Sequence, residues 1–126
     1  MTASINSFEK QQFMNVETYR KTGVAVQTPV WFVVVNGELC FTTETRSGKV
    51  KRLRRNPKVR VAPCKVNGEL LGDWHDGTAR FLSGDEILVV EKMFSRKYGL
   101  QKYWFDLLGR LQRRERLFIA IQLAEL

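Results

Sequence analysis

Short segments that alternate apolar and polar residues, or that concentrate β-branched and aromatic residues, run along most of the chain. Such segments are typical of strands that bury one face. The pairs Asn36-Gly37 and Asn67-Gly68 fit two-residue hairpin turns, because both residue types tolerate a positive φ. Pro29 cannot donate to a strand ladder, so it predicts an edge, a bulge or a bend within its strand. The predicted strands are Met14–Tyr19, Val24–Val35, Glu38–Thr43, Lys58–Val66, Glu69–Leu82 (long or broken) and Leu117–Leu123.

Helical spacing of apolar residues separates some of these strands. Ser47 is a candidate N-cap for a short basic helix, which Pro57 ends because proline disfavours helical geometry in the residue before it. Ser83 and Glu86 have the spacing of a capping box, and Gly99 fits the C-terminal cap of the helix that follows. The predicted helices are Ser7–Phe13, the basic helix with Val50 and Leu53 inward, a helix to about Tyr98 with Ile87, Val90 and Phe94 inward, and Leu100–Leu111.

The order of these elements predicts a mainly β fold. Strands joined by hairpins are antiparallel, and closure of such a sheet into a small barrel removes its exposed edges. The short basic helix follows the third strand, and a helical pair precedes the last strand. A length of 126 residues fits one domain over residues 1–126.

The composition is that of an ordinary globular protein, with 44% hydrophobic and 27% charged residues. No apolar run is long enough for a membrane-spanning helix, and no signal peptide is visible, so a cytoplasmic location is expected. Cys40 and Cys64 are then expected to be reduced and half-buried in strands. The net charge of +8 attracts polyanions: nucleic acid, an anionic membrane surface, or a phosphorylated and carboxylated cofactor.

The sequence lacks the motifs that several kinds of catalytic and binding site require. The chain has no G-x-S-x-G elbow, and its single histidine, His75, has no nucleophile beside it in the sequence. Ser47-Gly48-Lys49 departs from a P-loop, because Thr43 and Val50 stand where that motif needs Gly and Ser or Thr. No G-x-G-x-x-G is present, and one histidine with two scattered cysteines disfavours a metal site.

The basic corner after the third strand has two interpretations. Five basic residues within two helical turns could form a solvated helix face. Alternatively, a phosphate could bind at the helix N-terminus, on the Ser47 hydroxyl, the Gly48 amide and the Lys49 ammonium group. The residues alone leave both interpretations open.

Motifs spread over residues 7 to 123 resemble the split-barrel flavin-binding family related to pyridoxamine 5′-phosphate oxidase. The similarity is greatest to its branch of deazaflavin enzymes, which use coenzyme F420. The oxidase pattern has Ser-Arg-Lys at the corner where this chain has Ser-Gly-Lys, and this difference favours the deazaflavin branch. The matching motifs are Thr28-Pro29-Val30-Trp31-Phe32-Val33, Thr42-Thr43, Ser47-Gly48-Lys49-Val50-x-x-Leu53-Arg54-x-Asn56-Pro57-x-Val59, Ala62-Pro63-Cys64, Gly68, Gly72, Gly77-x-Ala79 and Lys97-Tyr98-Gly99.

The resemblance implies a six-stranded antiparallel split β-barrel that forms a homodimer, with one cofactor per subunit at the interface. It assigns the cofactor phosphate to Ser47, Gly48 and Lys49. Lys51 and Arg54 would add positive field over the phosphate and over the glutamate tail of F420. The tricyclic ring would be lined by Gln27, Thr28, Pro29, Val30, Thr42 and Thr43, with Trp74 stacking near the ring or substrate.

The implied function is hydride transfer between reduced coenzyme F420 and an unidentified small organic acceptor. The protein would position the cofactor and exclude solvent. No catalytic residue is assigned. The alternatives are an FMN-binding redox protein of the same class, and a non-catalytic module that binds a cofactor or a polyanion. Nucleic acid is disfavoured as a partner, but a basic cluster at Arg110, Arg113, Arg114 and Arg116 leaves it to be tested.

Overall fold

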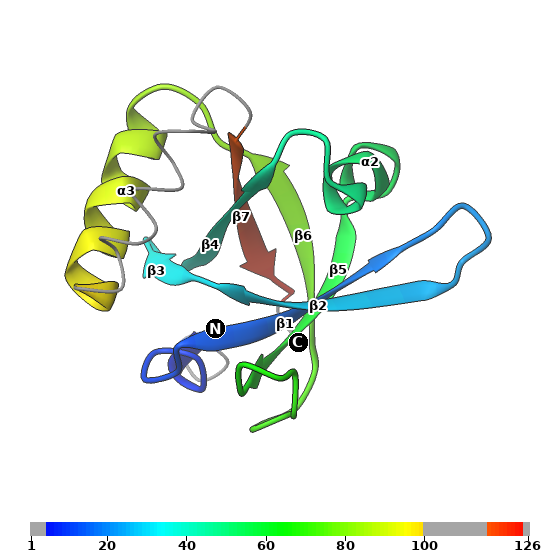
Figure 1. The fold of residues 1–126 in the computed structure, drawn as a ribbon, viewed down its shortest axis with the longest axis horizontal. Helices are drawn as coiled ribbons and strands as arrows, with labels where there is room; N and C mark the ends of the chain where they lie inside the picture. Colours follow the sequence, from blue (N-terminus) through cyan, green and yellow to red (C-terminus); the bar gives the residue numbers. More distant parts are fainter. Residues whose placement is uncertain (1–4, 100–115, 125–126) are drawn as a thin grey trace.

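The computed structural model describes residues 5–99 and 116–124. Its seven strands form one antiparallel sheet with the order β2-β1-β5-β6-β7-β4-β3. The sheet curls strongly on itself, and α2 and α3 lie outside it (Figure 1). The elements are β1 (Phe13–Tyr19), β2 (Ala25–Trp31), β3 (Val33–Val35), β4 (Glu38–Glu44), α2 (Gly48–Arg55), β5 (Lys58–Cys64), β6 (His75–Phe81), α3 (Asp85–Tyr98) and β7 (Arg116–Leu123).

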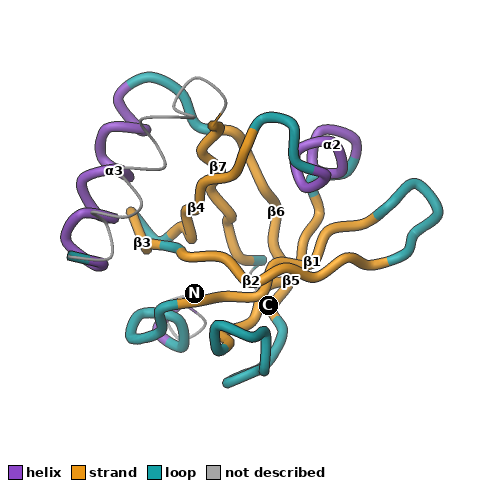
Figure 2. The backbone as a smooth tube through the Cα atoms, in the orientation of Figure 1, coloured by secondary structure: helices purple, strands orange, loops and turns teal. Residues whose placement is uncertain are grey.

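The two edge strands of the sheet are neighbours in the sequence. Only Phe32 separates β2 from β3, although they lie at opposite ends of the strand order. The sheet must therefore curl until its edges meet, and the backbone trace follows this curve (Figure 2). The expected antiparallel split barrel is confirmed. The strand count of six was wrong, because the segment Val24–Val35 divides at Phe32.

Pro29 does not cause this division. It lies inside β2, paired with Asn15 of β1. Because β2 is an edge strand, it has no neighbouring strand on its outer side. The missing N–H of Pro29 is therefore tolerated at this position.

Other boundaries also differ from the sequence pattern. Residues 5–10 form a helical turn and further turns, and Phe13 already pairs with Trp31 and Cys64, so the helix Ser7–Phe13 was wrong. The strand expected over Glu69–Leu82 is reduced to β6, preceded by an isolated bridge between Cys64 and Leu70. The N-cap of α3 is Gly84 without a side-chain hydrogen bond, so Ser83 does not cap the helix as expected. Of the predicted capping box, only the hydrogen bond from the Ser83 backbone to the Glu86 carboxylate is present. The helix Leu100–Leu111 lies outside the described residues.

Two apolar clusters arise from strand alternation. Phe41 and Ile119 point into the barrel, whereas Cys40 and Ala120 point outward beneath α3. Val90 and Phe94 of α3 are buried against this outer face, as predicted. Both cysteines are fully buried free thiols, so the expectation that they are half-buried was wrong. Within the described ranges, no helix is long and apolar enough to cross a membrane.

Candidate functional site

The corner between β4 and α2 is held by Ser47. Its backbone is extended, and its hydroxyl oxygen accepts the Val50 N–H at 3.3 Å, which confirms the predicted N-cap. The Thr43 hydroxyl also donates to this oxygen, over 3.1 Å. Because the Ser47 oxygen already accepts two hydrogen bonds, its own proton is available for another acceptor. The amides of the first turn of α2 are likewise free of helical partners.

Lys49 supplies the charge of this corner. Its side chain is half-buried, and it has no ion pair or hydrogen bond with any described residue. Burial lowers the pKa of Lys49, and the nearby positive charge of Arg52 lowers it further. A half-buried ammonium group beside another cation is costly unless an anion compensates it.

Arg52 lies against the same turn, although the sequence analysis assigned it no role. Its Nε donates to the hydroxyl of Thr18 over 2.6 Å, and Thr18 is fully buried in β1. The pKa of Arg52 is lowered by burial first, and then by Arg20 and Arg55. The spacing of Lys49 and Arg52, three residues apart on one helix, was the available signal.

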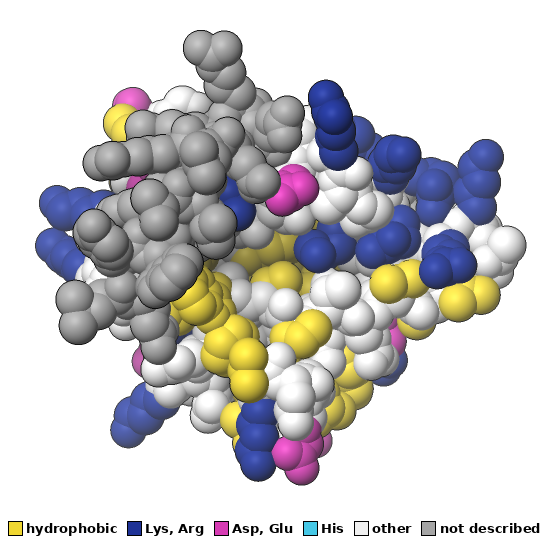
Figure 3. Space-filling view, in the orientation of Figure 1, with side chains coloured by type: hydrophobic (Ala, Val, Ile, Leu, Met, Phe, Trp, Pro, Cys, Tyr) yellow, Lys and Arg dark blue, Asp and Glu magenta, His cyan; other side chains and the backbone are white. Residues whose placement is uncertain are grey.

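These cations belong to a wider basic surface. Basic side chains gather over α2 and over the hairpin that joins β1 to β2 (Figure 3). Arg20 lies on this hairpin, and Arg55 donates to the Tyr19 carbonyl oxygen over 3.2 Å. Among the residues that the structure describes, Arg20, Lys49, Arg52 and Arg55 form no ion pair. The surface therefore fits an anionic ligand better than an internal salt-bridge network.

The predicted ring-lining residues lie on two strands near this corner. Gln27, Thr28, Pro29 and Val30 are in β2, and β2 contacts β4, which carries Thr42 and Thr43. The Thr28 hydroxyl oxygen is buried and has no hydrogen-bond partner in the described part of the chain. The Thr42 hydroxyl donates to the Leu117 carbonyl oxygen over 2.9 Å. The structure thus brings the two segments together, and it leaves one buried polar atom without a partner.

Three of the predicted residues lie away from Lys49. Lys51 is exposed, and the Arg54 guanidinium carbon lies 5.0 Å from the ring centroid of Phe81. The Trp74 ring stacks under Arg60, 4.9 Å from its guanidinium carbon.

Trp74 lies on the opposite face of β1 from Arg52. Arg60 pairs with Glu17, whereas Arg52 bonds to Thr18, and consecutive residues of a strand point to opposite faces. Gln27 also lies on the Glu17 side, because its Nε2 donates to Glu17 Oε1 over 2.9 Å. Within one chain, the corner and Trp74 are therefore separate.

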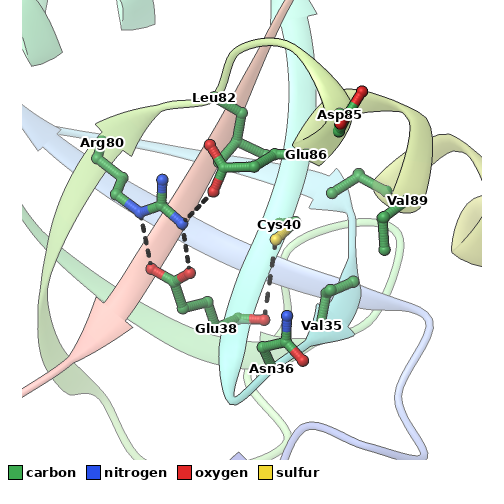
Figure 4. A pocket seen from close by; sticks show the side chains of 10 residues that line it. Val35, Asn36, Glu38, Cys40, Arg80, Leu82, Asp85, Glu86 and Val89 are labelled. Carbon is green, nitrogen blue, oxygen red and sulfur yellow. Dashed lines mark hydrogen bonds and ion pairs between the residues drawn. The ribbon is translucent and has the colours of Figure 1, made fainter.

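Away from the corner, a hollow lies between α3 and the turn from β3 to β4. It encloses about 220 Å³ and has both apolar and charged walls (Figure 4). Arg80 binds Glu38 at 2.7 Å and Glu86 at 2.8 Å, so the main charges of the hollow are paired with one another. Burial raises the pKa of the Cys40 thiol to about 12, which leaves this thiol protonated and unreactive. The corner is the stronger candidate site, because its cations have no acidic partner among the described residues, whereas Arg80, Glu38 and Glu86 of the hollow are paired with one another.

The described residues offer no metal site, since no group of three His, Cys, Asp or Glu side chains gathers among them.

Comparison with known proteins identifies the class. The sequence profile of the family described as pyridoxamine 5′-phosphate oxidase matches residues 1–121. The split barrel and this match together define a member of that family, and the chain belongs to it. A search of curated protein sequences found no match.

Solved structures share the fold at low sequence identity. The haem storage protein HutZ from Vibrio cholerae has a TM-score of 0.73 at 14% identity, covering 98% of this chain and 88% of its own. An FAD-binding protein from Mesorhizobium loti has a TM-score of 0.67 at 14% identity, covering 98% and 86%. A structure described as an F420 reductase has a TM-score of 0.61 at 15% identity, covering 95% and 92%. At these identities the likeness concerns the fold alone.

Proposed function

We propose that the chain is an oxidoreductase that uses coenzyme F420 and transfers a hydride to a small organic acceptor. The family match and the fold shared with an F420 reductase support this class. The observation that carries the proposal is the half-buried Lys49, which has no partner among the described residues, beside the available proton of Ser47. A phosphate group would relieve the repulsion between Lys49 and Arg52.

The residues present fit such a cofactor. Ser47, Gly48 and Lys49 would hold its phosphate, with Lys51 and Arg54 adding positive field. The ring would be lined largely by backbone groups of Gln27 to Val30, together with Thr42 and Thr43. The Thr28 hydroxyl, which has no partner among the described residues, could donate to a ring carbonyl or nitrogen. When bound, the deazaflavin supplies the hydride chemistry, while the protein orients it and excludes water.

FMN is the alternative cofactor, since it also carries a phosphate and a tricyclic ring. The fold shared with an FAD-binding protein favours a flavin equally well. Within one chain, Trp74 lies on the opposite face of β1 from Arg52. In a homodimer, we expect Trp74 of one subunit to lie at the ring site of the other subunit. A cytoplasmic location belongs to the same proposal.

Parallel titrations of the purified protein with F420 and FMN, read by fluorescence, test the proposal. Lys49→Ala should weaken binding by about tenfold, the loss expected for one charge-assisted contact of about 1.4 kcal/mol. Lys92→Ala removes the same charge from the exposed face of α3 and serves as the matched control. Oxidation of reduced F420 by a panel of small acceptors then tests catalysis. Absence of binding of both cofactors would refute the proposal.

The non-catalytic alternative makes a different prediction. Binding of a nucleic acid or another polyanion would be spread over many Lys and Arg residues and would weaken steeply with salt. Titration of an oligonucleotide at two salt concentrations distinguishes the two functions. A salt-sensitive oligonucleotide complex, without saturable cofactor binding, would favour the polyanion-binding module.

A further inference from the structure

The guanidinium group of Arg52 occupies space that a side chain at Gly48 would need. A Cβ atom built on Gly48 would lie 2.6 Å from Nη1 of Arg52, well inside contact distance. Gly48 does not have a positive φ, so its backbone conformation does not explain the glycine. In the position that it takes here, the Arg52 guanidinium fills the space beside Gly48, so a Cβ at Gly48 would displace it.

One hydrogen bond fixes this guanidinium and leaves the rest of it available. Nε donates to Thr18, and the other N–H groups have no acceptor among the described residues. A buried nitrogen without an acceptor would count as a buried unsatisfied atom, and neither terminal nitrogen of Arg52 does so among the described residues. Both nitrogens are therefore accessible to solvent. An arginine anchored through Nε keeps its planar pair of terminal nitrogens for a bidentate contact with an oxyanion.

The charge environment excludes a structural ion pair. Arg52 lies close enough to Lys49 to lower the pKa of that lysine, and Arg20 and Arg55 lower the pKa of Arg52 itself. None of these four groups has an acidic partner in the described part of the chain. An internal ion pair would need a carboxylate here, whereas the phosphate of an external ligand can contact two of the cations together.

We infer that Arg52 is a second cationic ligand of the bound phosphate, acting with Lys49, and that Gly48 leaves room for its guanidinium in this position. The inference rests on the proposed function for the identity of the phosphate carrier. The corner then recognises a phosphate through a bidentate guanidinium, an ammonium group and the Ser47 hydroxyl.

Comparison of FMN with riboflavin, which lacks the phosphate, tests this inference by fluorescence titration. Arg52→Gln should weaken FMN binding by about tenfold, as expected for one charge-assisted contact. Riboflavin affinity should stay within about twofold, because only the phosphate contact is lost. Gly48→Ala should reproduce part of the FMN effect, since its Cβ displaces the guanidinium. Arg96→Gln on α3 is the matched control for loss of one positive charge.

Two outcomes would overturn the inference. Unchanged FMN affinity in Arg52→Gln would show that the guanidinium does not touch the phosphate. Equal loss of FMN and riboflavin would show a structural role for the residue.

A probe without a flavin separates this inference from the proposed function. Inorganic phosphate, compared with chloride at equal ionic strength, should raise the unfolding midpoint of the wild type more than that of Arg52→Gln. Equal midpoint shifts in the two proteins, or no shift in the wild type, would overturn the inference. If phosphate stabilises the protein in a way that depends on Arg52, but neither F420 nor FMN binds, the proposed cofactor is refuted. The inference that Arg52 belongs to a phosphate-binding site would still hold.

Discussion

The hydroxyl oxygen of Tyr98 lies 2.9 Å from the amide nitrogen and 2.7 Å from the carbonyl oxygen of Phe32. Phe32 is the single residue between β2 and β3, where the chain passes from one edge of the sheet to the other. A buried backbone without a strand partner needs another hydrogen-bonding group. The last turn of α3 supplies that group, so α3 stabilises the point at which the barrel closes.

Tyr98→Phe should lower the free energy of unfolding by about 1–3 kcal/mol, because it leaves the buried Phe32 N–H without an acceptor, while the Phe32 carbonyl oxygen keeps its hydrogen bond from Lys97 Nζ. The single proton of the Tyr98 hydroxyl can be donated to the carbonyl oxygen of either Phe32 or Gln12, so only one such bond is lost with it. Urea denaturation with an unchanged m-value would measure this loss. Tyr19→Phe is the matched control, since Glu17 keeps Arg60 and Gln27 after the Tyr19 hydroxyl is removed. Equal losses in both variants would contradict the role of Tyr98.

Lys97 should make stability depend on pH in the alkaline range. Its Nζ donates to the Phe32 carbonyl oxygen over 2.9 Å, and burial lowers the pKa of Lys97 to about 8. The unfolded chain, with a lysine pKa near 10.5, therefore holds more protons between pH 8 and pH 10.5. The free energy of unfolding of the wild type should rise across this range relative to Lys97→Met, by about 2 kcal/mol at most.

Urea denaturation of both proteins at pH 7.5, 9 and 10.5 measures this difference. The neighbouring charged groups Glu9 and Arg96 are present in both proteins, so their contributions cancel. Burial moves the pKa of Tyr98 upward, so its ionisation lies above this range. A flat difference, or one that falls with pH, would show that Lys97 is not held as a desolvated ammonium group.

The sequence predicted the features of this fold that depend on neighbouring residues. The Ser47 N-cap and the turn at Asn36-Gly37 follow from local backbone chemistry, and both residues of that turn have a positive φ. The strand Lys58–Val66 was predicted from its β-branched residues, and β5 covers most of it. Such features need no information from distant parts of the chain.

The features that were missed depend on distant contacts. The division at Phe32 is stabilised by Tyr98, 66 residues away, so Pro29 was the only visible candidate for a break. The orientation of Arg52 depends on Thr18, 34 residues away. A run of basic residues on one helix therefore indicated an anion site, but it did not show which of them face it.

The cysteines should be inert in the folded protein. Burial raises the pKa of the Cys40 thiol to about 12, and it also raises the pKa of Cys64. Iodoacetamide reacts with the thiolate, so native protein at pH 8 should stay unmodified while urea-unfolded protein gains two adducts, one per cysteine. Mass spectrometry gives the count directly. Modification of either thiol before unfolding would show that its strand opens to solvent.

Glu17 should make stability depend on pH in the acid range, with the opposite sign to Lys97. This buried carboxylate accepts two hydrogen bonds from Arg60, at 2.6 and 3.1 Å, and further bonds from Gln27 and Tyr19. The hydrogen bond from Arg60 is the main reason why the pKa of Glu17 falls from 4.5 to about 2, although burial acts against it. A depressed pKa in the folded state adds stability above pH 4.5, which is lost as the pH falls toward 2.

Glu17→Gln should therefore be about 2 kcal/mol less stable than the wild type at pH 7, with a difference that shrinks steadily below pH 4.5. Urea denaturation at pH 7, 4 and 3 measures it. Glu69→Gln is the control, because its ion pair with Lys65 is exposed and should contribute no more than about 0.5 kcal/mol. Since Gln27 and Trp74 both contact the Glu17–Arg60 pair, loss of this carboxylate should also disturb the outer face of β1. A difference between Glu17→Gln and wild type that persists undiminished at pH 3 would show that packing, and not charge, holds that face together.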